Sequence, residues 1–375
     1  MPKAPKKISR YSSVRNKTDK IQTIMWELIK NSGRPVVLYG TGNAAEKILR
    51  ICEEKDISIA GIFASDDFVR NRSFAGIPVI SYSEAKARFG YMTVLLCFGT
   101  HLEPVIENIK RIDREQDLYA PDLPIAGGGI FDAEYCKEHK SDFVDIMDLL
   151  ADRKSREVLS GVINYKLSGK LNYLFDIETS VEDNYALLDL GPDESYVDLG
   201  AYNGDTIELF LNCAGGDCKN IIAMEPEKRN FRKLSNYCEG LNMENVFLYN
   251  MAASSGPAVL EFQKGSGRGG QANTGKTIEI PADSVDNIIA KLAEEGRDIH
   301  PTFIKMDLEG MEEEALKGAE NTIKNDKPKM LVSAYHRNSD LFNIPKKVLA
   351  MNPSYKVYLR HSPCVPAWEV DYFFV

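Results

Sequence analysis

Two stretches of the chain alternate apolar, strand-like segments with amphipathic helical segments, and this alternation constrains the fold more than any other feature. The first stretch contains VVLYG, ISIAGIFAS, GIPVI and MTVLLCFG, and the second contains YVDLG, IIAME, VFLYN, FIKMD and KMLVSAY. Near-continuous apolar runs are typical of strands buried on both faces of a parallel sheet, which helical crossovers connect. The sequence therefore predicts an α/β protein with two doubly wound, Rossmann-like domains.

The domain boundaries follow from the same pattern. We assign 1–33 to a basic tail and lead-in helix (the helix at 18–31), 34–118 to a small Rossmann-like domain, 119–190 to a linker and helical lead-in, and 191–375 to the second domain. Prolines and the triplet Gly127-Gly128-Gly129 mark the linker. The last two strand-like segments, KVYLRH and VDYFFV, have no full helix between them, which predicts an antiparallel hairpin at the edge of the second sheet.

Composition excludes several classes of protein. A net charge of −9 argues against nucleic acid as the main substrate, and no apolar run approaches the roughly 18 residues that a membrane-spanning helix needs. The basic N-terminal segment lacks the apolar core of a secretory signal. The seven cysteines form no CxxC pair or zinc spacing, so we expect reduced thiols and a cytoplasmic location.

Two motifs of the second domain indicate a nucleoside cofactor. VDLGAYNGDT places Asp198, Gly200 and Gly204 after a buried strand, and the GxxxG spacing favours S-adenosylmethionine over a dinucleotide, whose pyrophosphate needs a GxGxxG turn. Glu225 ends the next strand, where a carboxylate accepts hydrogen bonds from both ribose hydroxyls. The alternative is that Asp198 caps a turn and Glu225 is solvated.

A third motif, FIKMDLEGMEEEAL, indicates the reacting end of the site. Asp307 ends a strand, and Glu309 follows it before a helix. Removal of a proton from the acceptor needs a base, and His336, after the following strand, is our candidate, with Asp307 or Glu309 orienting it. The alternative for His336 is a structural, hydrogen-bonded role. These three residues also suit Mg²⁺ or Mn²⁺, but we assign no metal site, and we interpret Glu312-Glu313-Glu314 as helix N-terminal charge and solvated surface.

These motifs, together with LKGAENTI, resemble the FkbM family of methyltransferases over roughly residues 150–375. The resemblance implies a seven-stranded class I methyltransferase sheet with an antiparallel edge hairpin, S-adenosylmethionine as donor, and a hydroxyl acceptor on a sugar, glycan or polyketide. Many relatives carry Asp-Gly where this chain has Asn203-Gly204, which removes one carboxylate.

Each part of this site has assigned residues. We assign cofactor binding to Asp198, Gly200, Ala201, Tyr202, Asn203, Gly204, Asp205, Glu225, Pro226, Ala252 and Asp307. We assign substrate binding to Tyr185, Arg268, Arg360 and His361, and catalysis to His336, Asp307 and Glu309. Arg268 belongs to a glycine-rich segment, 263–277, which is either a basic lid over an anionic acceptor or a disordered surface loop.

The first domain carries its own glycine motif. Gly40, Gly42 and Ala45 form G-x-G-x-x-A between a strand and a helix, and Asp66 follows the second strand. This is either a candidate nucleotide site or a packing feature of a domain used for homodimerisation or acceptor positioning. Two further functions stay open: a nucleotide-sugar or NAD-dependent enzyme working through this domain, and a non-enzymatic ligand-sensing scaffold.

Overall fold

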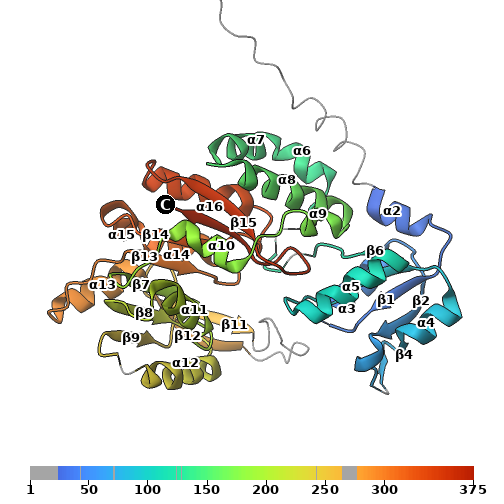
Figure 1. Ribbon diagram of the computed structural model, residues 1–375, viewed down its shortest axis with the longest axis horizontal. Coiled ribbons are helices and arrows are strands. Elements are labelled where there is room, and N and C mark those ends of the chain that lie inside the picture. The colour runs from blue at the N-terminus through green and yellow to red at the C-terminus, as the bar shows by residue number, and fades with distance from the viewer. Residues whose placement is uncertain are drawn as a thin grey trace, which may run out of the picture. The chain divides into compact units, whose positions relative to one another are not determined.

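The computed structural model (Figure 1) describes residues 24–42, 44–70, 72–123, 125–127, 129–241, 243–263 and 277–375. The chain divides into two compact units, neither of which is continuous in sequence. The first comprises Met1–Leu123, Ile130–Lys140 and Ser160–Asp176, and the second comprises Pro124–Gly129, Ser141–Leu159 and Ile177–Val375. The segment 119–190, predicted as linker and lead-in, therefore contributes to both units.

The first unit contains a six-stranded sheet of order β3-β4-β2-β1-β5-β6, in which all neighbours are parallel except β3 and β4. Its strands are β1 (Val36–Tyr39), β2 (Ile59–Ala64), β3 (Ser73–Phe74), β4 (Ile77–Ser81), β5 (Thr93–Leu96) and β6 (Asp117–Tyr119). Its helices are α2 (Ile24–Lys30), α3 (Ala44–Glu54), η1 (Asp66–Phe68), α4 (Tyr82–Phe89), α5 (Glu103–Glu115), α6 (Ala133–Glu138) and α9 (Asn172–Phe175). Helix α2 falls within the predicted helix at 18–31, whose first residues lie outside the described ones.

Alternation along the strands gives this sheet two apolar faces. Leu38 packs in one cluster with Ile48 of helix α3. On neighbouring positions of the strands, Tyr39 stacks on Phe63 with ring centroids 4.7 Å apart, and Phe63 contacts the ring of Tyr82 in α4. The sheet is therefore covered on both faces, as a doubly wound arrangement requires.

The second unit contains a seven-stranded sheet of order β15-β16-β14-β13-β7-β8-β9. Its strands are β7 (Ser195–Leu199), β8 (Asn220–Met224), β9 (Val246–Tyr249), β13 (Phe303–Met306), β14 (Lys329–Ser333), β15 (Val357–His361) and β16 (Val370–Phe374). Strands β7, β8, β9, β13 and β14 are parallel, and β16 pairs antiparallel with both β14 and β15. The predicted parallel strands and the antiparallel edge hairpin are confirmed.

The remaining elements complete the second unit and the shared segment. A three-stranded sheet of order β10-β12-β11 comprises β10 (Ala252–Ala253), β11 (Ala258–Gln263) and β12 (Thr277–Asp283). From residue 140 onward the helices are α7 (Lys140–Leu149), α8 (Arg153–Ser168), α10 (Val181–Tyr185), η2 (Ala186–Leu188), α11 (Asp205–Ala214), α12 (Lys228–Gly240), α13 (Val285–Glu294), α14 (Glu312–Gly318), α15 (Glu320–Asn325) and α16 (Asp340–Met351), apart from α9.

An aromatic stack anchors the large sheet. Tyr196 of β7 stacks on both Phe210 of α11 and Phe303 of β13, with ring centroids 4.3 and 4.9 Å away. These side chains belong to one buried cluster with residues of β8, β14 and β16. Stacked aromatic pairs add to the apolar area that they bury, so they fix β7 and β13 side by side. The turns that follow these two strands are positioned by this packing.

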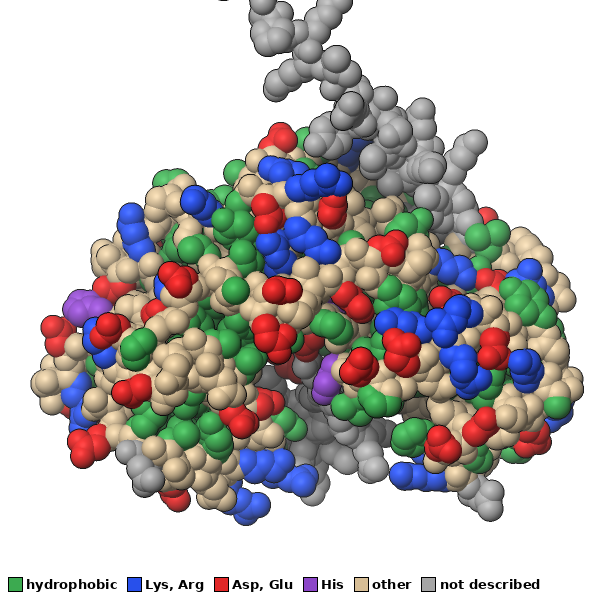
Figure 2. Space-filling model, viewed as in Figure 1, with side chains coloured by type: hydrophobic (Ala, Val, Ile, Leu, Met, Phe, Trp, Pro, Cys, Tyr) green, Lys and Arg blue, Asp and Glu red, His purple; other side chains and the backbone are tan. Residues whose placement is uncertain are grey.

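The surface is charged and mixed. Figure 2 shows acidic and basic side chains interspersed over one face of the molecule. No helix in the part of the chain that the structure describes is long and apolar enough to cross a membrane.

Candidate active site

The candidate site lies at the carboxyl edge of the seven-stranded sheet. Leu199 of β7 is in register with Met224 of β8 and Met306 of β13, and Met306 is in register with Val332 of β14. The segments that follow these four strands therefore begin at one edge, where open α/β sheets bind their ligands. All three motifs singled out in the sequence fall there.

The turn after β7 approaches β13 so closely that it requires glycine. Gly200 has φ +83°, and a Cβ on it would lie 2.1 Å from the carbonyl oxygen of Asp307. Gly204 has φ +95°, and a Cβ there would lie 2.6 Å from the ring of Tyr237. Both glycines thus serve backbone geometry, and Gly200 allows the turn to lie against Asp307 of the third motif.

Asp198 and Lys305 form a buried pair beneath this turn. The Asp198 side chain is fully buried, accepts a 2.5 Å hydrogen bond from the Thr206 hydroxyl, and lies 3.4 Å from Lys305 Nζ. Lys305 also donates to the carbonyl oxygen of Gly200 at 3.0 Å. Burial lowers the pKa of Lys305, but the charges of Asp198 and Asp307 outweigh it and raise the pKa above its ordinary value. Sequence reasoning overlooked Lys305, although a lysine within an apolar strand was a signal.

Glu225 is a buried carboxylate, and the alternative of a solvated side chain is wrong. It is 5% exposed, and its two oxygens accept backbone N–H groups of Tyr202 at 2.9 Å and Glu227 at 2.7 Å. Burial raises its pKa to about 7, against the opposing effect of these two hydrogen bonds. A carboxyl group with this pKa changes charge near neutral pH.

The other predicted cofactor residues lie in the glycine turn, directly after Glu225, or in β10. Tyr202 has φ +47° and is about half exposed, whereas Ala201 is buried. Asn203 accepts the N–H of Asp205 through its side chain at 3.2 Å. The remaining two are Pro226, which follows Glu225, and Ala252, which is buried in β10.

A cluster of carboxylates surrounds His336 beyond β13 and β14. The His336 side chain is buried, with Nε2 lying 3.4 Å from Asp307 and 3.6 Å from Glu309, and Nδ1 lying 2.9 Å from Glu312 Oε1. Burial lowers the pKa of His336, but the contact with Glu312 and the charges of Asp307 and Glu309 raise it to about 9. The structure thus brings the three predicted catalytic residues together.

Glu312 is the unexpected member of this cluster. Its interpretation as solvated surface is wrong, since it is only 1% exposed. Its Oε1 accepts the N–H of Leu308 at 2.8 Å, because Glu309 and Gly310 both have positive φ and turn the backbone toward it. The strand-to-helix turn therefore carries one carboxylate, Glu312, inward, while Glu309 keeps 45% of its side chain exposed.

Two neighbours complete the surroundings of the cluster. The Tyr335 hydroxyl donates to Asp307 Oδ1 at 3.1 Å. Asp340 is buried and accepts the N–H of Arg337 at 2.7 Å. Burial, and then the charge of Glu312, raise the pKa of Asp340 to about 7. Negative charge therefore predominates around the imidazole.

Among the predicted substrate residues, Arg360, His361 and Tyr185 are buried away from solvent. Arg360 donates to Asp152 Oδ2 at 2.6 Å and to the Ser155 hydroxyl at 2.8 Å. His361 is fully buried, which lowers its pKa to about 4, and Tyr185 packs in the core cluster of the large sheet. Arg268 lies outside the described residues.

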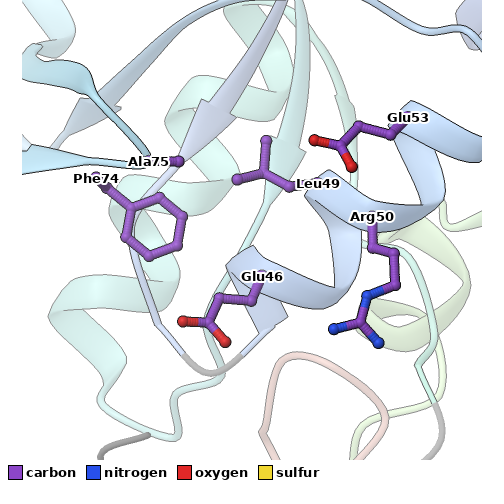
Figure 3. A pocket seen from close by; sticks show the side chains of 6 residues that line it. All are labelled: Glu46, Leu49, Arg50, Glu53, Phe74 and Ala75. Carbon is purple, nitrogen blue, oxygen red and sulfur yellow. The ribbon is translucent and has the colours of Figure 1, made fainter.

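In the first unit, the Phe98 side chain occupies the space beside the two glycines of the glycine motif. A Cβ on Gly40 would lie 2.5 Å from the ring of Phe98, and one on Gly42 would lie 2.8 Å from Phe98 Cβ. Asp66 accepts the N–H and the hydroxyl of Ser83 at 3.0 and 2.7 Å, which lowers its pKa. The hollow shown in Figure 3 lies elsewhere on α3, lined by Glu46, Leu49, Arg50, Glu53, Phe74 and Ala75. These contacts support the packing interpretation of Gly40, Gly42 and Ala45.

One solved structure shares this fold over almost the whole chain. The chain is similar to a methyltransferase FkbM from Methylobacillus flagellatus KT, with a TM-score of 0.71 and 21% identity over 97% of this chain and 96% of that chain. An rRNA methylase from Streptococcus thermophilus matches 52% of this chain and 92% of its own, with 12% identity and a TM-score of 0.33. No curated protein sequence matches the chain.

The part of the chain that contains the candidate site is similar to a methyltransferase domain, and the fold agrees with this similarity. Residues 198–355 match the family model described as the methyltransferase FkbM domain. This matched segment begins at Asp198 and contains Glu225, Asp307 and His336.

Proposed function

We propose that the chain is an S-adenosylmethionine-dependent O-methyltransferase whose cofactor lies against the turn between Gly200 and Gly204. The observation that carries this proposal is the environment of Glu225. Each of its oxygens accepts one backbone N–H, and a carboxylate offers about four acceptor positions in all. Two positions therefore remain for the two hydroxyls of a ribose.

We further propose that Asp307 and Glu309 meet the acceptor. Their side chains are 25% and 45% exposed, whereas His336 is buried behind them. A carboxylate in contact with the acceptor hydroxyl takes up its proton during in-line methyl transfer, and His336 holds both carboxylates in position. Adjacent carboxylates suit an acceptor with several hydroxyls, which supports the sugar or glycan expected from the family resemblance.

Calorimetry with S-adenosylmethionine tests the cofactor assignment. We expect binding to the full-length protein, and a loss of about 10- to 100-fold in Glu225→Ala, since hydrogen bonds to a charged group contribute about 1.5 to 3 kcal/mol. Glu227→Ala is the matched control, because that exposed carboxylate caps α12 two residues away. Absence of binding, or an equal loss in both variants, would remove the argument.

Radiolabelled methyl transfer to a panel of sugars, glycans and polyketides tests the acceptor. We expect product from a hydroxyl-rich acceptor and not from matched compounds whose hydroxyls are blocked. Nucleic acid is not expected to be a substrate. A cytoplasmic location and a homodimer formed through the first unit stay predictions from the sequence. The NAD-dependent alternative gains no support, because the Phe98 side chain occupies the space beside Gly40 and Gly42.

A further inference from the structure

The cluster around His336 contains buried polar atoms that form no hydrogen bond. Both ring nitrogens of His336 and Oε2 of Glu312 are buried without a hydrogen bond. Nδ1 lies 2.9 Å from Glu312 Oε1, an ion-pair contact when the imidazole is protonated, and the same oxygen accepts the N–H of Leu308. Buried polar atoms without partners are rare and costly, and they commonly mark the site of an ion or water.

Three side chains of this cluster are placed as ligands of one ion. Asp307, Glu312 and His336 each offer one ligand atom, and these atoms lie within 4.8 Å of one another. Bonds of about 2.1 Å to a common ion place its ligand atoms about 3.0 to 4.2 Å apart. The three side chains would therefore have to move by about an ångström or less to bind one ion. From these observations we infer that Asp307, Glu312 and His336 form a binding site for a divalent cation of the Mg²⁺ or Mn²⁺ class.

The chemistry of the three ligands and the surrounding charge support this assignment. Two carboxylates and one imidazole suit Mn²⁺ and related divalent ions, and Mg²⁺ accepts the oxygen ligands. The neighbouring cation Arg337 donates through Nε to the carbonyl oxygen of Gly310 at 3.0 Å and not to the carboxylates. The ion reaches the site from the Asp307 side, where a quarter of that side chain is exposed.

The position of the ion deepens the proposed function and rests on it. Asp307 follows β13 beside the cofactor turn, where the acceptor oxygen is expected. A divalent ion that held this oxygen would orient it and lower the pKa of its hydroxyl, which would ease transfer of the proton to Glu309. His336 then serves as a ligand and not as a base. The sequence suggested Glu309 as the second carboxylate of such a site, whereas the structure places Glu312 there.

Titration with Mn²⁺, followed by the loss of the free-ion signal in electron paramagnetic resonance, tests the site on the full chain without cofactor. We expect one Mn²⁺ bound per chain, displaced by Mg²⁺, and an upward shift of the melting temperature. Glu312→Gln and His336→Gln should each weaken Mn²⁺ binding by about tenfold or more, since even outer-shell changes cost about 10- to 100-fold. The amide introduced by Glu312→Gln retains an oxygen that can accept the Leu308 N–H.

Glu194→Gln is the matched control. Glu194 is also a buried carboxylate, but it precedes β7 at the opposite edge of the same sheet and pairs with Lys329 at 2.9 Å. Its Mn²⁺ affinity should equal that of the wild type. If Glu312→Gln fails to fold, His336→Gln and Asp307→Asn provide the same comparison.

The inference is overturned if the wild type binds no Mn²⁺ at about millimolar concentration, or if the cluster variants bind as well as Glu194→Gln. Calorimetry with S-adenosylmethionine distinguishes this failure from failure of the proposed function. Cofactor binding without Mn²⁺ binding would leave the methyltransferase proposal standing and remove the metal site. Mn²⁺ binding without cofactor binding would leave the metal site standing and remove the methyltransferase proposal.

Discussion

Glu225 should make the affinity for S-adenosylmethionine depend on pH. Burial raises its pKa to about 7 in the cofactor-free protein, and ribose hydroxyls donate preferentially to its ionised form. With that pKa, the ionised fraction is about one tenth at pH 6 and about nine tenths at pH 8. The affinity should therefore rise about tenfold over this range, with most of the change below pH 7.

Calorimetry of wild type and Glu225→Gln at pH 6, 7 and 8 measures this effect. S-adenosylmethionine has a titrating amino group of its own, so the difference between the two proteins is the diagnostic quantity. The variant should bind more weakly and lose the tenfold change, while Glu227→Gln keeps it. If Glu225→Gln shows the same pH dependence as the wild type, the carboxyl group does not bind the cofactor in its ionised form.

Three further predictions concern stability. Gly200→Ala should lose about 2 kcal/mol or more in urea denaturation, because positive φ and a Cβ 2.1 Å from the Asp307 carbonyl oxygen are both unfavourable; a loss within error would show that the turn relaxes. Asp152→Ala leaves the buried Arg360 guanidinium without its carboxylate and should lower the free energy of unfolding by about 3 kcal/mol, with the KM for the acceptor unchanged. A raised KM without destabilisation would instead support the assignment of Arg360 to the substrate site. Because the folded protein raises the pKa of Glu225, protonation of this group favours the folded state, and its contribution to the free energy of unfolding is complete below the ordinary pKa of 4.5. Up to about 3 kcal/mol of the free energy of unfolding is lost as the pH rises through about 7. Urea denaturation should show this loss in the wild type and not in Glu225→Gln.

The fold was predictable because its signals are local and repeated. Each strand of the large parallel sheet is a near-continuous apolar run, and helical segments separate these runs. The terminal hairpin was predictable from the absence of a helix between β15 and β16. The order of the strands in space was not predicted, because a buried apolar strand does not specify its neighbours in the sheet.

The site was predictable only where a motif ends a strand. Asp198, Glu225 and Asp307 each follow or end a parallel strand, so the sheet brings them to one edge. The burial of Glu312 was not predictable, because three successive glutamates at a helix start resemble an exposed face. Its inward direction depends on the positive φ of Glu309 and Gly310, which residue types alone did not reveal.

The distribution of cations explains why one carboxylate at this edge is structural while others are available to a ligand. Lys305 comes from the centre of β13 and reaches Asp198 and the carbonyl oxygen of Gly200, so it neutralises the first motif and fixes its turn. In the third motif, His336 lies among the carboxylates of Asp307, Glu309 and Glu312. Because the Gly200 turn also touches the Asp307 carbonyl oxygen, the glycine turn and the acidic cluster are held in fixed register. A methyl donor at the turn and an acceptor at the cluster would therefore meet at a separation that the backbone itself sets.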